Sequence, residues 1–156
     1  MREISRGPLL YNIWDRRNEG VASGVEEWFM QMGLFAARHH SREIVWVMLV
    51  QRAARVLASL YLHANEMTME EACTFHRQWT ARQWMDNEPE LLRLEQQLYL
   101  RQHGYGTSNL VGKYLIEKLI MEKTQRLESA GHRFVMREFF QEFNDIGCIP
   151  VTLMGQ

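Results

Sequence analysis

The chain has 156 residues, of which 46% are hydrophobic, and its 18 basic and 19 acidic side chains leave a formal net charge of −1. This length suffices for one domain with a hydrophobic core, and a near-neutral chain without blocks of like charge argues against an electrostatic nucleic-acid binder or a polybasic membrane anchor. The two cysteines, Cys73 and Cys148, stand far apart, so they predict neither a thiolate zinc site nor a disulfide framework.

Targeting signals are not visible in the sequence. The first residues contain no apolar core of signal-peptide length, and the longest apolar run, residues 44–50, is far too short to cross a bilayer. We therefore expect no membrane partner. With two free thiols, the sequence favours a cytoplasmic location, provided that the chain begins at its natural start.

Helical periodicity extends along almost the whole sequence, and it predicts one all-α domain over residues 1–156, an irregular bundle of about six helices. The first helix is expected over Asp15–Ala37. The second is expected from Ser41, as its N-cap, to His63, and its first half, residues 44–50, is apolar on every side, which is typical of a central helix covered all round. The stripe of the first helix consists of Val21, Val25, Trp28, Met32 and Phe35.

Capping signals place the next two helices. Thr68 and Glu71 have the spacing of a capping box, which opens a third helix that runs to about Trp79. Pro89 stands where a first turn tolerates its missing N–H, and it predicts a fourth helix that runs to about Gln102.

The C-terminal third begins with a glycine-rich turn, residues 103–108, followed by a long helix to about Ser129. A last helix is expected over Val135–Ile146, with Gly147 as its C-cap. The tail, residues 149–154, is apolar enough that we expect it to pack on the bundle. The buried face of the last helix is predicted to consist of Met136, Phe139, Phe140 and Phe143.

Metal-ligand spacing is absent from the histidines. There is no His-Glu-x-x-His motif, and the neighbours His39 and His40 would point about 100° apart on a helix, so they cannot share a metal ion. The remaining histidines are isolated, and their spacing favours structural or exposed positions: His63, His76, His103 and His132.

Charged residues in the first two helices are more informative. Glu19 and Glu26 are seven residues apart and so share a helix face, and small residues follow Glu19, as happens where another element or a ligand approaches closely. The small residues are Gly20, Ala22, Ser23 and Gly24. The alternative is a solvated acidic stripe with small residues for helix packing. Arg52 and Arg55 follow the apolar run, where an arginine needs a partner, either in a buried ion pair or as part of an anion clamp.

Tyr105 lies between Gly104 and Gly106. Flexible neighbours allow such a tyrosine to aim its hydroxyl into a cleft, but it could also serve as a hydrophobic anchor. The turn is not a phosphate loop, because it lacks the lysine of the Walker motif and follows no strand.

Four blocks of the sequence, in family order and over nearly its whole length, resemble the helical domain of unknown function 885 family. In the order of the chain they are residues 18–22 with Glu26 and 32–34, residues 52–55 leading to 62–64, residues 104–108 with 112–113, and residues 137–139 leading to 147–151. The chain departs from the family's usual residues at four positions. Val21 stands in place of tryptophan, His103 of proline, Asn109 of tyrosine and Phe140 of histidine.

Members of that family resemble zinc metallopeptidases. The resemblance implies that Glu19 is the third zinc ligand, that His63 and Tyr105 face the cleft and act as catalytic residues, and that Glu26, Arg52 and Arg55 surround the site. The family's His-Glu-x-x-Pro-Gly-His motif, which would supply two ligands and the general base, has no counterpart here. Zinc is expected in full-length members, and this chain alone should not bind it tightly.

Three hypotheses follow. The chain could be the C-terminal segment of a metallopeptidase-like protein, inactive alone, with a peptide substrate only in the complete protein. The motif could instead come from a separate chain that supplies the missing N-terminal portion. The alternative is a non-catalytic helical interaction module or homo-oligomer, whose apolar helix faces serve a partner.

Overall fold

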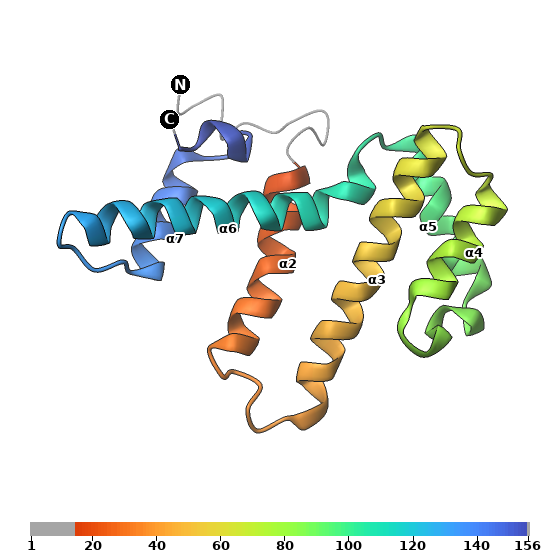
Figure 1. Cartoon of the computed structure of the whole chain (residues 1–156), viewed down its shortest axis with the longest axis horizontal. Helices are drawn as coiled ribbons and strands as arrows, with labels where there is room; N and C mark the ends of the chain where they lie inside the picture. Colours follow the sequence, from red (N-terminus) through yellow and green to blue (C-terminus); the bar gives the residue numbers. More distant parts are fainter. Residues whose placement is uncertain (1–14, 156) are drawn as a thin grey trace.

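The computed structural model describes residues 15–155, and these residues form helices and no strand, which confirms the all-α class (Figure 1). The six α-helices found agree with the number expected. The elements are α2 (Asp15–Gln31), α3 (His39–His63), α4 (Met69–Trp79), the 3-10 helix η1 (Ala81–Asn87), α5 (Pro89–Arg101), α6 (Tyr105–Ser129), α7 (Met136–Ile146) and the 3-10 helix η2 (Val151–Leu153).

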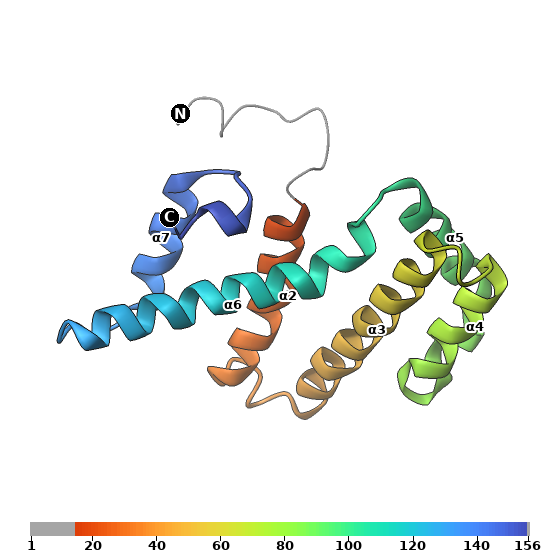
Figure 2. The same cartoon turned by 45° about the horizontal axis from the view of Figure 1, so that its top comes forward.

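Helix α6 forms the long axis of the molecule, and the other elements are distributed along it (Figure 1). Helix α2 crosses α6 near its first half, and α7 with η2 packs near its far half. Helices α3, α4 and α5 group at its N-terminal end, and α2 and α3 form a hairpin whose turn lies to one side of α6 (Figure 2).

Helix α2 ends at Gln31, six residues before the predicted end at Ala37. Gly33 adopts φ +87°, its N–H donates to the Met30 carbonyl, and the N–H of Leu34 donates to the Phe29 carbonyl. This is the Schellman arrangement, in which a left-handed glycine terminates a helix and satisfies its last carbonyls. The prediction was wrong because apolar periodicity continues past the glycine that stops the helix.

The expectation that residues 44–50 form a covered central helix was also wrong. Val45 is buried, but Ile44, Trp46 and Val50 are 53%, 48% and 44% exposed. The second half of α3 is the packed part, where Ala58 contacts the apolar side of α4. Helix α3 also begins at His39, before the predicted N-cap, and no side chain caps it.

By length and hydropathy alone, residues 40–63 are long and apolar enough to cross a membrane, with a mean hydropathy of 1.4. Both this value and the buried share refer to the most apolar stretch of 18 residues, of which only 28% is buried inside the structure. The short run seen in the sequence therefore understates the apolar character of α3.

The predicted caps of the middle helices are confirmed. Thr68 Oγ1 accepts from the Glu71 N–H at 3.2 Å, and the Thr68 N–H donates to Glu71 Oε2 at 2.7 Å. Pro89 is the first residue of α5. The 3-10 helix η1 was not predicted, and Thr80 precedes it in extended backbone.

The C-terminal elements also follow the prediction. Gly104 adopts φ +80° just before α6, and Gly147 adopts φ +88° after α7. The tail packs as expected, with Val151 of η2 buried in the main core. That core consists of Trp28, Ile116, Phe139, Phe143 and Val151.

Two glycines bring α2 and α6 into backbone contact. A Cβ built on Gly112 would lie 1.8 Å from the carbonyl oxygen of Arg16, and one built on Gly20 would lie 2.4 Å from the carbonyl carbon of Gly112. Neither glycine can therefore carry a side chain without separating the helices. The sequence predicted that these small residues allow the close approach of either a ligand or another element. The structure shows that the approaching element is α6.

The substitution Gly112→Ala should destabilise the fold by about 3 kcal/mol, because overpacking against backbone cannot be relieved by a rotamer change. Gly33→Ala is the matched control. Its Cβ meets nothing within 4 Å, so only its positive φ opposes it, at a cost of about 1 kcal/mol. Urea unfolding followed by circular dichroism measures both, and an equal loss in the two variants would contradict a tight crossing.

His76 of α4 is a buried structural histidine. It is fully inaccessible, and its Nδ1 lies 3.2 Å from Nε2 of Gln96 in α5, so the neutral ring can accept from the amide. Burial, with a contribution from the Arg55 charge, lowers the pKa of His76 from 6.5 to about 4. The native state therefore holds this ring uncharged at neutral pH.

Stability should fall as the pH drops. Because the folded pKa lies below the unfolded value, the unfolded chain binds more protons between pH 6.5 and 4, and about 3 kcal/mol of unfolding free energy is lost across that window. Urea unfolding at pH 7.5, 5.5 and 4 tests this. The variant His76→Gln should show a shallower decline than the unsubstituted chain, and parallel declines would rule out His76 as the cause.

Candidate functional site

The glycine crossing brings Glu19 of α2 to Tyr105, the first residue of α6. The Tyr105 hydroxyl donates to Glu19 Oε1 at 3.3 Å, and both side chains are partly buried. Asp15 lies one turn before Glu19, and burial together with the Glu19 charge raises the pKa of Asp15. The structure thus joins two of the residues that the sequence singled out.

The environment of Tyr105 keeps its hydroxyl protonated. Burial, and then the neighbouring Glu19 carboxylate, raises the pKa of Tyr105 above its usual value of 10. A phenol with a raised pKa is a hydrogen-bond donor over the whole physiological range. Tyr105 therefore orients the Glu19 carboxylate rather than competing with it for a cation.

Tyr99 of α5 connects the other candidate residues, and the sequence analysis missed it. Its ring lies 6.0 Å from that of Tyr105, and the Arg55 guanidinium lies 5.3 Å from its centroid. Its carbonyl oxygen lies 3.0 Å from His63 Nε2. The available signal was its register, since Leu92, Gln96 and Tyr99 form the buried face of α5.

Arg52 and Arg55 lie one turn apart on α3 but have different partners. Arg52 forms a bidentate ion pair with Glu26, at 2.5 and 3.0 Å, as the ion-pair interpretation predicted. Arg55 makes no ion pair with any carboxylate in residues 15–155, and its Nε atom is buried without a hydrogen-bond partner. The ion-pair interpretation fails for Arg55, so the anion-clamp hypothesis stays open for this residue alone.

His63 was expected to share the cleft with Tyr105, and the structure does not bring the two into contact. Its Nε2 is satisfied by the Tyr99 carbonyl, and its ring stacks on His103 with centroids 4.8 Å apart. Tyr99 contacts both His63 and Tyr105.

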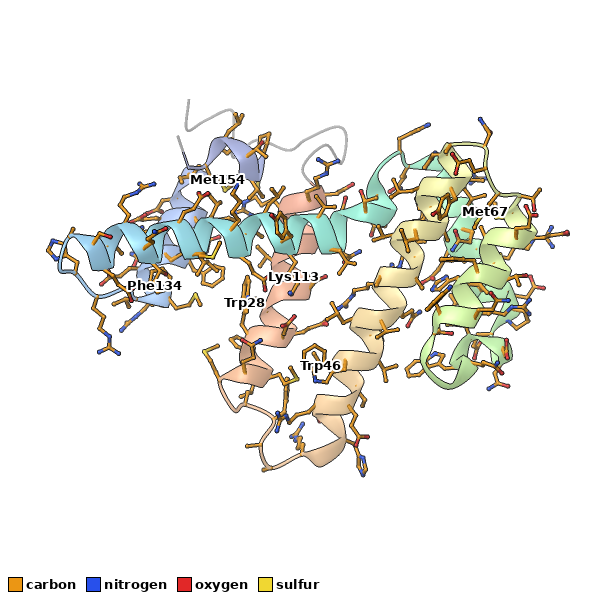
Figure 3. All side chains as sticks on the ribbon, viewed as in Figure 1. Trp28, Trp46, Met67, Lys113, Phe134 and Met154 are labelled. Carbon is orange, nitrogen blue, oxygen red and sulfur yellow. The ribbon has the colours of Figure 1, made fainter. Side chains whose placement is uncertain are left out.

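Two further polar contacts continue the Glu19–Tyr105 pair along the same helices, at the same spacing in sequence. Ser23 Oγ donates to Asn109 Oδ1 at 3.0 Å in the buried interface. One turn further, Nζ of Lys113 in α6 lies 2.8 Å from Oε2 of Glu27 in α2. Lys113 is labelled in Figure 3. We call Glu19–Tyr105, Ser23–Asn109 and Glu27–Lys113 the polar ladder. Asn109 is thus an interface residue.

The polar ladder can supply one carboxylate to a metal ion but not a complete site. Carboxylate oxygen is a normal zinc ligand, and a catalytic zinc site needs three protein ligands. In residues 15–155 no three His, Cys, Asp or Glu side chains gather into a metal-binding group. Glu26 is engaged by Arg52 and Glu27 by Lys113, which leaves Asp15 and Glu19 as the carboxylates of α2 without a cationic partner in the described structure.

Comparisons with known proteins add no further constraint. No family model, no curated protein and no solved structure matches this chain.

The Arg52–Glu26 pair should contribute about 1 kcal/mol to stability, because Glu26 remains 41% exposed and solvent weakens the attraction. A double-mutant cycle with Arg52→Gln and Glu26→Gln measures the coupling free energy by urea unfolding. The cycle for the largely exposed pair His40–Glu43 is the control and should give a value close to zero. Equal coupling in both cycles would show that Arg52 gains nothing from its burial.

Proposed function

We propose that this chain is the C-terminal segment of a zinc-metallopeptidase-like protein. It contributes one carboxylate ligand, Glu19, and part of the wall of a peptide-binding cleft, and it does not catalyse hydrolysis alone. The resemblance to the domain of unknown function 885 family motivates the proposal. The observation that supports it best is the contact between Glu19 and Tyr105, residues 86 positions apart in sequence.

The state of Glu19 suits a ligand role. Glu26 and Glu27 of α2 pair with Arg52 and Lys113, whereas Glu19 accepts only a neutral phenol hydrogen bond and lies beside Asp15, a second carboxylate without a cation. A partly buried carboxylate without a cation gains most from binding one. A hydrogen bond from Tyr105 fixes its orientation, as outer contacts of metal ligands commonly do.

Bound zinc would activate water and polarise a peptide carbonyl. The residues of this chain would act around it. Glu19 would hold the ion from the α2 side. The Tyr105 hydroxyl, which donates its one hydrogen bond to Glu19 in this structure and stays protonated at neutral pH, would redirect that bond to the negatively charged oxygen that develops on the substrate. Arg55, unpaired with any described carboxylate, offers its guanidinium to a substrate carboxylate. His63 could take part in catalysis only if its Nε2 gave up the contact with the Tyr99 carbonyl oxygen.

The rest of the active site would come from a polypeptide with the His-Glu-x-x-Pro-Gly-His motif. The exposed apolar side chains on the outer part of the α2–α3 hairpin suit such a contact, because a segment of a larger fold exposes apolar surface where the remainder packs. Trp46 stands on α3 among them (Figure 3). The set comprises Phe29, Met32, Leu34, Ile44, Trp46 and Val50.

Complementation tests the proposal. The purified chain, supplied with zinc, should not cleave a panel of short peptides. Adding a polypeptide that carries the upstream portion of a full-length family member should yield cleavage that a chelator abolishes. Glu19→Gln should then lower kcat/KM at least about 100-fold, because one of three ligands is lost. Tyr105→Phe should lower kcat by about 100-fold with KM little changed.

The control is Glu43→Gln, an exposed carboxylate of α3, which should leave the complemented activity unchanged. Circular dichroism checks that each variant is folded. Chelator-sensitive cleavage by the chain alone, or full complemented activity in Glu19→Gln, would refute the proposal.

The second candidate is a non-catalytic module that associates with itself, and the exposed apolar side chains of the α2–α3 hairpin favour it equally. The same samples separate the two. A chain that is dimeric by light scattering, becomes monomeric with Trp46→Glu, and shows no complemented cleavage would support this alternative.

A further inference from the structure

A cavity of about 330 Å³ lies between α2 and α7, on the side of α2 that faces away from the polar ladder. Arg17, Val21, Val25 and Trp28 line it, whereas Glu19, Ser23 and Glu27 meet α6. Opposite faces of one helix thus serve two separate sites. The apolar wall consists mainly of Trp28, Phe29, Met32, Met136, Phe140 and Phe143.

The size and lining of the cavity are those of a small-molecule site. Ligand pockets start at about 300 Å³ and are lined by apolar and aromatic side chains with a few polar groups. An apolar cavity of about 150 Å³ holds benzene, so this one has room for about a dozen non-hydrogen atoms. Phe29 and Met32 are exposed at its edge, so a ligand can enter from solvent.

Two arginines give the cavity its charge. Arg137 of α7 is exposed and has no ion-pair or hydrogen-bond partner among the described residues. Arg17 donates to the Phe143 carbonyl and to Asn144 Oδ1, both at 3.3 Å, and its guanidinium lies 4.5 Å from the Phe143 ring centroid. It has no carboxylate partner in the described structure, and its Nε is buried without a hydrogen bond. An anion at the cavity would neutralise charge that the protein leaves unpaired.

We propose that this cavity binds a monocarboxylic acid, with its apolar chain between α2 and α7 and its carboxylate held by Arg137 and Arg17. The apolar lining excludes a polar body such as a sugar or a nucleotide, since few polar groups could satisfy it. The two cations discriminate against amines and favour the acid over the alcohol of the same length. The site shares no residue with the polar ladder. Phe29 and Met32 at its edge also belong to the exposed apolar set of the α2–α3 hairpin, so its test uses the chain without any added polypeptide.

The test is calorimetric titration of the full chain with decanoate, which has a dozen non-hydrogen atoms, below its micellar concentration. Octanoate, hexanoate and decanol are the comparison ligands. Decanoate should bind at one saturable site. Affinity should rise about fourfold for each methylene from hexanoate to decanoate. Decanol should bind at least about threefold more weakly than decanoate, and the gap should narrow at high salt.

Variants locate the site. Arg137→Ala should weaken decanoate about threefold to fivefold and leave decanol unchanged, because an exposed charge is screened. Arg133→Ala, an exposed arginine that does not line the cavity, should change neither affinity. Val25→Phe fills the cavity and should abolish binding of both ligands. Met32→Trp, at the exposed edge, should also weaken binding if Val25→Phe does not fold.

The absence of saturable decanoate binding would overturn the proposal. So would equal affinities for decanoate and decanol, or an Arg133→Ala variant that weakens decanoate as much as Arg137→Ala, because the carboxylate would then not be recognised at this cavity.

Discussion

The backbone contact between Gly20 and Gly112 is the constraint on which the rest of the structure depends. At this crossing the helices approach so closely that a single methyl group on Gly112 would overlap the Arg16 carbonyl. The approach allows short side chains such as Ser23 and Asn109 to hydrogen-bond directly, and it sets the three contacts of the polar ladder at one repeating interval. Without it, Glu19 and Tyr105 would be two isolated polar residues on separate helices, and neither would have a defined environment.

The parts of the fold that local chemistry determines could be predicted from the sequence. The capping box at Thr68, the proline that opens α5 and the glycine after α7 each satisfy their own helix end, so their positions need no knowledge of neighbours. The predicted end of α2 was wrong although Gly33 signals a helix end, because the apolar period of the sequence continues past this glycine. The prediction that neighbouring elements cover residues 44–50 was wrong for a different reason. Hydrophobicity predicts that a segment needs a neighbour, but whether one is available depends on the tertiary arrangement.

The residues of the candidate site also divide into those that the sequence could single out and those that it could not. Tyr105 could be singled out because glycines flank it, Glu19 because small residues follow it, and Arg52 because an arginine after an apolar run needs a partner. The register of Tyr99 marks it only as a residue of the buried face of α5, and a tyrosine there looks like any other core residue. Its importance comes from which residues surround it, namely Arg55, His63 and Tyr105. Helix α2 thus has two different faces. Its polar residues contact α6, and the opposite face, which is apolar with an arginine at its edge, points toward α7.

The polar ladder also governs the order in which the chain can fold during synthesis. Each of its contacts joins residues 86 positions apart, so α2 is made long before its partner helix. A nascent chain that has completed the α2–α3 hairpin still lacks α6 and α7, so the faces of α2 that pack on these helices remain in contact with water or with a chaperone. Docking is delayed until most of the polypeptide has left the ribosome, and closing so large a loop makes the step slow. Premature termination before Gly112 would thus release an α2 that can pack on α3 but lacks the surfaces of α6 and α7.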